Sequence, residues 1–204
     1  MKLRSKTICL LMLGLSLMPL TAIHAEIEHQ YASLKETKLK LKDFSFPMLD
    51  GQPINLRTAT HNKRLVLVHY FAAWCHNSNY DVVTINKLYR QYKDQGFEVI
   101  GVCEYSSAQE LREFIAEHKP AYPICIEGDD KTARTASTHY DYRRKAKDER
   151  KYGTPFNILI RAANIEAKGD TFAKLVYTAA GELIEEEAEK FIKQELQADT
   201  NLKQ

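Results

Sequence analysis

Cys75 is the residue of this chain best suited to covalent chemistry, because it ends an apolar stretch and lies in the run Trp74-Cys75-His76-Asn77-Ser78. A second cysteine three positions later would complete a C-x-x-C pair, in which the second thiolate attacks the mixed disulfide formed by the first. The chain has Ser78 there, a C-x-x-S pattern. Cys75 must therefore stop at a mixed disulfide, be resolved by an external thiol, or recruit another cysteine of the chain.

Two other cysteines bear on that choice. Without Cys9, which lies in a segment expected to be removed, the chain keeps Cys75, Cys103 and Cys125, and an odd number leaves at least one thiol free or paired outside the molecule. Cys103 and Cys125 fall in strands predicted to be neighbours. A structural disulfide between them, two free buried cysteines, and a resolving role for Cys103 stay open as alternatives.

The chain around Cys75 predicts a strand followed by a helix. Residues 64–71 form a continuous apolar run, typical of a parallel strand buried on both faces. After Cys75 the apolar residues recur at helical spacing up to the Gln95-Gly96 stop.

Further segments repeat this alternation. We expect a hairpin over 43–56, strands over 97–103, 123–126, 156–160 and 174–177, and helices over 108–118 and 183–196. This order predicts an α/β domain with a parallel sheet covered by helices.

Residues 131–152 carry a dense group of basic side chains, Arg143, Arg144, Lys145, Lys147, Arg150 and Lys151, interleaved with tyrosines. A solvated helix or loop is one interpretation. A docking surface for an acidic protein partner is the other.

Residues 1–25 have the pattern of a signal peptide, with Lys2, Arg4 and Lys6 before an apolar run over 8–20. That run is too short for a stable membrane span, so we expect a periplasmic or secreted protein. Removing it changes the net charge from +2 to about −1, which offers no case for nucleic acid as a partner. We expect a polar, loosely attached lead-in over 26–42, one domain over 43–197 and a polar tail over 198–204.

Three segments of the chain resemble the thioredoxin superfamily, in its TlpA/ResA-like branch of exported thiol-disulfide oxidoreductases. They are residues 66–75, the following helix with Asn86-Lys87-Leu88-Tyr89, and the strand from Gly96 to Val102. Gly153-Thr154-Pro155 matches the cis-proline loop of that family. The resemblance implies a thioredoxin-like fold, in which a central mixed sheet is flanked by helices, with an N-terminal hairpin and an inserted strand and basic segment. It also implies that Cys75 lies at a helix N-terminus, where free N–H groups and the helix dipole favour the thiolate.

The resemblance implies a substrate site beside the thiol. Thr154 and Pro155 would present backbone groups to an extended peptide, with Trp74 next to the sulfur. His76 would place a donor or a positive charge beside Cys75.

Two further side chains are catalytic candidates. His69 stands six residues before Cys75, where the family commonly has Asp or Asn, and would either exchange a proton near neutral pH or be a core histidine. Asp81 matches the acidic residue that several ResA-like members hold near their thiols.

Other chemistries are disfavoured. Copper-binding relatives of this fold use two cysteines and a histidine, whereas Cys75, His76 and His69 offer one sulfur, so we expect no metal and no cofactor. A peroxidase is disfavoured because Ala72 stands where a hydroxyl residue is expected.

Two functions therefore compete. In the first, Cys75 is a monothiol nucleophile that forms mixed disulfides with protein or low-molecular-weight thiols, giving reductase- or isomerase-type exchange. In the second, a redox-inactive binding or assembly protein uses the cis-proline groove or the basic segment to hold a partner.

Overall fold

The structure is a computed structural model that describes residues 28–201. The predicted signal peptide at residues 1–25 and the last three residues lie outside this range. The strands are β1 (Tyr31–Ala32), β2 (Lys35–Lys42), β3 (Ser45–Pro47), β4 (Pro53–Asn55), β5 (Leu65–Phe71), β6 (Phe97–Glu104), β7 (Ile124–Gly128), β8 (Phe156–Arg161), β9 (Thr171–Ala179) and β10 (Glu182–Leu183). The helices are α1 (Leu56–Ala59), α2 (His76–Tyr92), α3 (Ala108–His118), α4 (Thr138–Lys145) and α5 (Glu185–Asn201), with short 3₁₀ turns η1 (Lys93–Gln95), η2 (Arg134–Ala136) and η3 (Ala162–Asn164).

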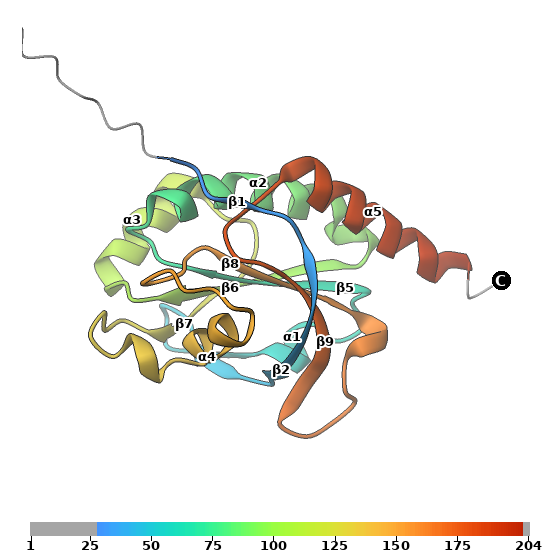
Figure 1. The fold of residues 1–204 in the computed structure, drawn as a ribbon, viewed down its shortest axis with the longest axis horizontal. Helices are drawn as coiled ribbons and strands as arrows, with labels where there is room; N and C mark the ends of the chain where they lie inside the picture. Colours follow the sequence, from blue (N-terminus) through green and yellow to red (C-terminus); the bar gives the residue numbers. More distant parts are fainter. Residues whose placement is uncertain (1–27, 202–204) are drawn as a thin grey trace, which may run out of the picture.

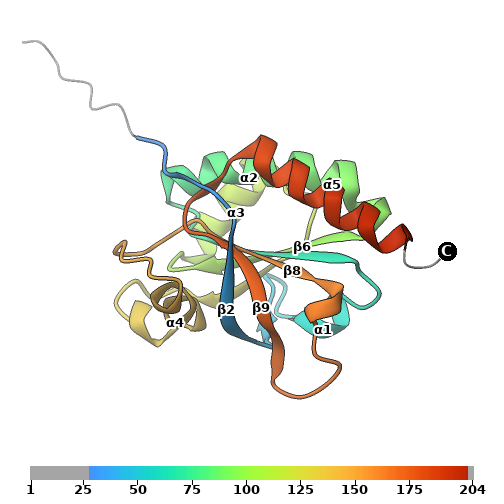
Figure 2. The ribbon, with the colours of Figure 1, turned by 45° about the vertical axis from the view of Figure 1, so that its right-hand side comes forward.

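A six-stranded sheet in the order β2-β9-β8-β5-β6-β7 forms the centre of the molecule. Strands β5, β6 and β7 are parallel, while β8 and β9 run antiparallel to their neighbours. Helices α2, α3 and α5 cover one face, and α1 and α4 lie on the other (Figure 1, Figure 2). The prediction of a central mixed sheet flanked by helices is confirmed.

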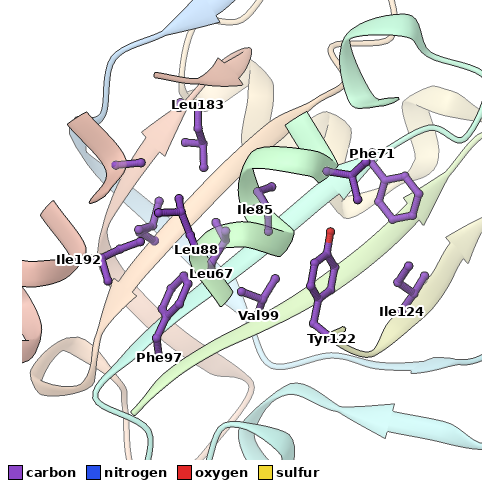
Figure 3. Close-up of a cluster of buried hydrophobic side chains, with 14 of the residues drawn as sticks. Leu67, Phe71, Ile85, Leu88, Phe97, Val99, Tyr122, Ile124, Leu183 and Ile192 are labelled. Atoms are coloured by element: carbon purple, nitrogen blue, oxygen red, sulfur yellow. The ribbon is translucent and has the colours of Figure 1, made fainter. Parts of the chain in front are cut away.

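The apolar side chains of β5 alternate between two cores, because successive residues of a strand point to opposite faces. Leu65, Leu67 and Phe71 pack under α2, α3 and α5, where Figure 3 shows Leu67 and Phe71 with Ile85, Leu88 and Ile192. Val66, Val68 and Tyr70 face the second core on the side of α1 and α4. Burial on both faces explains why this strand is a continuous apolar run.

The hairpin predicted over 43–56 is present as β3 and β4, which pair antiparallel. Gly51 takes a φ of +83° in its turn, and Gln52 N–H donates to Asp50 Oδ1 at 2.9 Å. Glycine is the residue that adopts this backbone conformation without a steric penalty.

In the described part of the expected lead-in over 26–42, residues 35–42 are not loosely attached. Residues 35–42 form β2, which pairs antiparallel with β9 and buries Leu39 and Leu41 in the second core. The final helix also extends past its predicted end at Leu196, so that the expected tail begins inside α5. Within residues 28–201, no helix combines the length and the apolar character needed to cross a bilayer.

Candidate active site

Cys75 is the N-cap residue of α2, in extended conformation with φ −83° and ψ 120°. Its N–H donates to Ala72 O at 3.0 Å, which turns the chain sharply between β5 and the helix. Its carbonyl accepts from Asn79 N–H at 3.1 Å and from Asn79 Nδ2 at 2.8 Å. The thiol is half-buried at the positive end of a 17-residue helix, the place expected for it.

The loop before β8 meets this thiol. Cys75 Sγ lies 3.4 Å from Thr154 O, within reach of a hydrogen bond donated by the S–H group. The peptide bond between Thr154 and Pro155 is cis, and both residues are buried. The structure thus brings together Cys75, Thr154 and Pro155 from segments almost 80 residues apart, while pairing of an extended peptide with Thr154 stays a prediction.

Arg150 fixes the loop of residues 153–155 through hydrogen bonds to its backbone carbonyls. Its Nη2 donates to Gly153 O at 3.1 Å and to Pro155 O at 3.0 Å. Its guanidinium also binds Asp148 at two points, Nε to Oδ1 at 2.9 Å and Nη2 to Oδ2 at 2.8 Å. A bidentate arginine–carboxylate pair is geometrically specific, so it fixes the guanidinium that supports the loop.

The basic segment is therefore not a continuous solvated surface. Arg143 is 1% exposed and donates through Nη1 to Arg150 O at 2.7 Å, with Asp148 Oδ2 at 3.5 Å. Arg144 and Lys147 are exposed. Arg143 is therefore not part of a solvated face, and Arg150 supports the Thr154 loop. Docking of an acidic partner on the exposed basic side chains of residues 131–152 stays a prediction.

Trp74 lies beside Cys75 and is anchored at its indole nitrogen, which donates to Tyr105 O at 2.8 Å. Its ring packs edge-on against Tyr152, with centroids 5.0 Å apart, and Lys131 Nζ lies 4.6 Å from the ring centre. Trp74 is half-buried, so one part of its surface remains open next to the thiol.

Ser78 is fully buried one turn into α2, and its Oγ accepts from Ala72 N–H at 3.4 Å. The hydroxyl therefore lies against the turn that carries Cys75. A serine hydroxyl cannot form a disulfide, so this position supports the turn without supplying a second sulfur.

His69 and Asp81 form a buried polar pair between β5 and α2. His69 Nε2 lies 3.6 Å from Asp81 Oδ2, and His69 Nδ1 lies 3.4 Å from the hydroxyl of Tyr122. Burial lowers the pKa of His69 to about 3, so its ring is neutral near pH 7. Of the two readings of His69, the structure favours the core histidine.

Asp81 is fixed by two donors. Asn157 Nδ2 donates to Oδ2 at 2.7 Å and Leu183 N–H donates to Oδ1 at 2.8 Å. Burial raises the pKa of Asp81 to about 7, and these two hydrogen bonds oppose the shift. Asp81, and not His69, is thus the member of the pair that titrates near neutral pH.

His76 begins α2 and packs with other aromatic rings. Its ring centroid lies 4.7 Å from that of Tyr80 and 5.8 Å from that of His29. Within the described residues, no group of three His, Cys, Asp or Glu side chains has an arrangement that could hold a metal ion.

The alternative of a disulfide between Cys103 and Cys125 is not the one observed, because all three described cysteines are free. Strands β6 and β7 are neighbours as expected, and Cys103 is paired with Ile126 while Cys125 is paired with Val102. The two thiols point to opposite faces of the sheet, Cys103 into the first core and Cys125 into the second. Both cysteines are free and buried, which is the second of the alternatives left open by the sequence, and burial raises the pKa of both thiols to about 12.

Sequence reasoning missed Arg150, Asp148 and Asn157 as parts of the site. Asn157 carried a signal, because it is a polar residue in the otherwise apolar run from Phe156 to Ile160. Arg150 and Asp148 carried none, since their pairing is hidden in a segment of high charge density.

Comparisons with known proteins agree with this fold. Residues 37–165 match the model of the AhpC/TSA family. No match was found among curated proteins.

Solved structures share the fold at low sequence identity. The C-terminal domain of a protein assigned as a thiol-disulfide oxidoreductase from Bacteroides thetaiotaomicron gives a TM-score of 0.56 at 18% identity, over 79% of this chain and 97% of that one. A secreted disulfide oxidoreductase of Mycobacterium tuberculosis, homologous to E. coli DsbE, gives 0.52 at 10% identity, over 74% and 96%. A thiol:disulfide interchange protein of the thioredoxin family from Chlorobium tepidum gives 0.51 at 14% identity, over 78% and 97%. The predicted thioredoxin-like fold is confirmed, and the TlpA/ResA-like branch stays a prediction.

Proposed function

Because the chain belongs to the AhpC/TSA family, we propose that it carries out thiol–disulfide exchange, with Cys75 as its single nucleophilic thiol. The observation that carries this proposal is the position of Cys75 Sγ, half-exposed at the N-terminus of α2 and 3.4 Å from Thr154 O. The names of the structural neighbours, which are thiol-disulfide oxidoreductases, support the same chemistry.

The exchange needs no cofactor. The thiolate of Cys75 attacks one sulfur of a substrate disulfide, a new S–S bond forms to Cys75, and the other substrate sulfur leaves as a thiolate. An external thiolate then attacks the mixed disulfide and releases Cys75. Electrons pass only between sulfur atoms, so the external thiol is the reductant.

The neighbouring residues fit this single-thiol cycle. Ser78 cannot attack the mixed disulfide, and Cys103 lies buried in the first core with a pKa of about 12. The mixed disulfide should therefore persist until an external thiol arrives.

Trapping of the mixed disulfide tests the proposal. The purified chain is incubated with glutathione disulfide, and peptide mass analysis reports which cysteine gains the glutathionyl group. We expect modification of Cys75, its loss in Cys75→Ser, and no change in Cys103→Ala or Cys125→Ala. A Cys75 that stays unmodified in the folded protein, with exchange activity unchanged in Cys75→Ser, would favour the redox-inactive binding protein.

We also propose that the protein is exported to the periplasm or secreted, on the strength of the basic and apolar pattern of residues 1–25. Export suits a protein whose substrates are disulfides, since these persist in oxidising compartments. N-terminal sequencing of protein made in cells tests this, with a mature start near Glu26 expected and an intact Met1 against it.

A further inference from the structure

A cavity of about 380 Å³ lies at the carboxyl ends of β6 and β7. Its wall contains Glu104, the last residue of β6, Glu127 of β7, and Asp129 and Asp130 just after β7. The carboxyl ends of parallel strands are where open α/β sheets bind ligands. Of the described residues, four acidic ones and no lysine or arginine line the cavity, so its lining favours a positively charged ligand.

Glu104 is the observation that points to a ligand. Its side chain is 0% exposed, and among residues 28–201 no N–H or hydroxyl group donates to either of its carboxyl oxygens. The carboxyl of Glu127 is its one polar neighbour within hydrogen-bond reach in that part of the chain. The large majority of buried polar groups in proteins form hydrogen bonds. A buried carboxyl on a cavity wall to which no protein group donates is therefore expected to accept hydrogen bonds from a ligand. Burial first, and then Glu127, raise the pKa of Glu104 well above its ordinary value, while Arg143 opposes them.

Three charged side chains near the cavity already accept or donate hydrogen bonds, although Arg143 Nε has no partner among the described residues. Glu127 accepts from Thr138 N–H at 2.5 Å and from His139 N–H at 3.4 Å, which fixes its carboxyl at the start of α4. Asp130 accepts from Thr132 N–H at 2.7 Å. The nearby cation, Arg143, donates through Nη1 to Arg150 O and Asp148.

The geometry points to a binding site for an organic cation, in which Glu104 and Glu127 accept hydrogen bonds from a primary ammonium or guanidinium group. An ammonium offers three donors and a guanidinium five, enough to satisfy both carboxyls at once. Phe46, Ala133 and Ala136 also line the cavity, and they would pack against the methylene chain that carries such a group. A bound metal fits less well, since no described group of three acidic, His or Cys side chains has a metal-binding arrangement.

The cation has two sources of the same chemistry, a lysine or arginine side chain of a polypeptide, or a free small amine. Tyr105 connects the cavity to the neighbour of Cys75 in the chain. It lines the cavity, and its carbonyl accepts a hydrogen bond from the indole N–H of Trp74. The site itself does not depend on the redox activity of Cys75.

Calorimetric titration of the full chain with methylguanidinium and with n-butylamine tests the site. We expect saturable binding of both cations and none of N-methylurea, a neutral molecule of similar shape. Glu104→Gln should weaken cation binding at least tenfold, because the amide keeps the shape but cannot ionise to pair with the cation and turns an NH₂ donor toward it. Glu149→Gln, which removes an exposed carboxylate elsewhere, is the matched control and should bind as the wild type does.

A second titration identifies the source. An acetylated tripeptide amide with central arginine that binds at least tenfold more tightly than methylguanidinium assigns the site to a polypeptide side chain. Equal affinity assigns it to a free amine. Circular dichroism confirms that each variant is folded, and Glu127→Gln replaces Glu104→Gln if the latter does not fold. Absence of saturation up to about 10 mM of either cation, or equal binding by wild type and the folded variant, would overturn the proposal.

Discussion

Asp81 Oδ2 lies 3.6 Å from His69 Nε2, and burial acts on the two side chains in opposite directions. It raises the pKa of Asp81 to about 7 and lowers the pKa of His69 to about 3. In the unfolded chain the corresponding values are about 3.9 and about 6.5. Between about pH 4 and pH 6.5 the pair therefore holds one proton in both the folded and the unfolded state, and its two contributions to pH-dependent stability cancel.

Asp81→Asn should uncover the contribution of His69. The histidine binds a proton in the unfolded chain but not in the fold, so stability is lost as the pH falls from about 6.5 toward about 3, by about 1.4 kcal/mol per pH unit. Urea unfolding at a series of pH values, relative to wild type, measures this slope.

His69→Asn should uncover the opposite slope. Asp81 keeps its proton in the fold while the unfolded chain has lost it, so stability falls as the pH rises from about 4 to about 7, again by about 1.4 kcal/mol per unit. The double variant should restore the shallow dependence of the wild type. Single variants with parallel pH curves would contradict the assigned pKa directions.

Arg150→Ala should loosen the Thr154 loop. The change removes hydrogen bonds to Asp148, Gly153 O and Pro155 O, and we expect a loss of about 2 kcal/mol in the free energy of unfolding. It should also slow the reaction of Cys75 with glutathione disulfide, because Thr154 O would no longer be held beside the sulfur. Arg144→Ala, at an exposed side chain of the same segment, is the control and should change neither quantity. Equal effects of the two substitutions would contradict the supporting role of Arg150.

Gly153→Ala should destabilise the protein strongly. Gly153 has a φ of +65°, and an added Cβ would overlap the guanidinium of Arg143, which is buried and cannot move aside. We expect a cost of about 3 kcal/mol or more. Gly128→Ala is the matched substitution, since a Cβ there meets nothing within 4 Å and should cost less than about 1 kcal/mol. Thermal unfolding of both variants decides the point.

Ser78→Cys should convert the single-thiol cycle into an internal one. The new thiol would stand at the C-x-x-C position, one turn into α2, and would attack the mixed disulfide on Cys75. The lifetime of the glutathionylated form, followed by mass spectrometry, should fall at least tenfold, whereas Ser78→Ala should leave it unchanged. A mixed disulfide that persists equally in both variants would show that position 78 cannot reach the Cys75 sulfur.

Sequence patterns predicted β5 and β6 from continuous apolar runs, and α2 and α3 from apolar residues at helical spacing. The structure has these four elements at the expected places. The meeting of Cys75 with Thr154 followed from the resemblance and not from the periodicity. The pattern failed at β2, where only Leu39 and Leu41 mark a buried face among lysines. It could not choose among the alternatives for Cys103 and Cys125, since a prediction of neighbouring strands does not say which face of the sheet each side chain occupies.

The burial of Arg143 could not be predicted for a related reason. Charge density in a sequence suggests solvation, and it does not reveal that one acidic residue five positions later, Asp148, lies within 3.5 Å of this guanidinium. The pairing of Arg143 with Asp148 depends on how the chain after α4 folds back against the helix, which a pattern of charges does not reveal.

Strand β2 is one edge of the six-stranded sheet, and the backbone groups along such an edge can pair with a strand of another molecule unless they are blocked. One of them is blocked, because Lys42 N–H donates to the hydroxyl of Tyr142 at 2.9 Å. Four exposed lysines, Lys35, Lys38, Lys40 and Lys42, lie on this strand, and its register against β9 shifts twice. Like charges and an irregular edge both oppose the addition of a foreign strand. The lysine-rich sequence of β2, from which we expected a loosely attached lead-in, thus opposes aggregation by strand addition at this edge of the sheet.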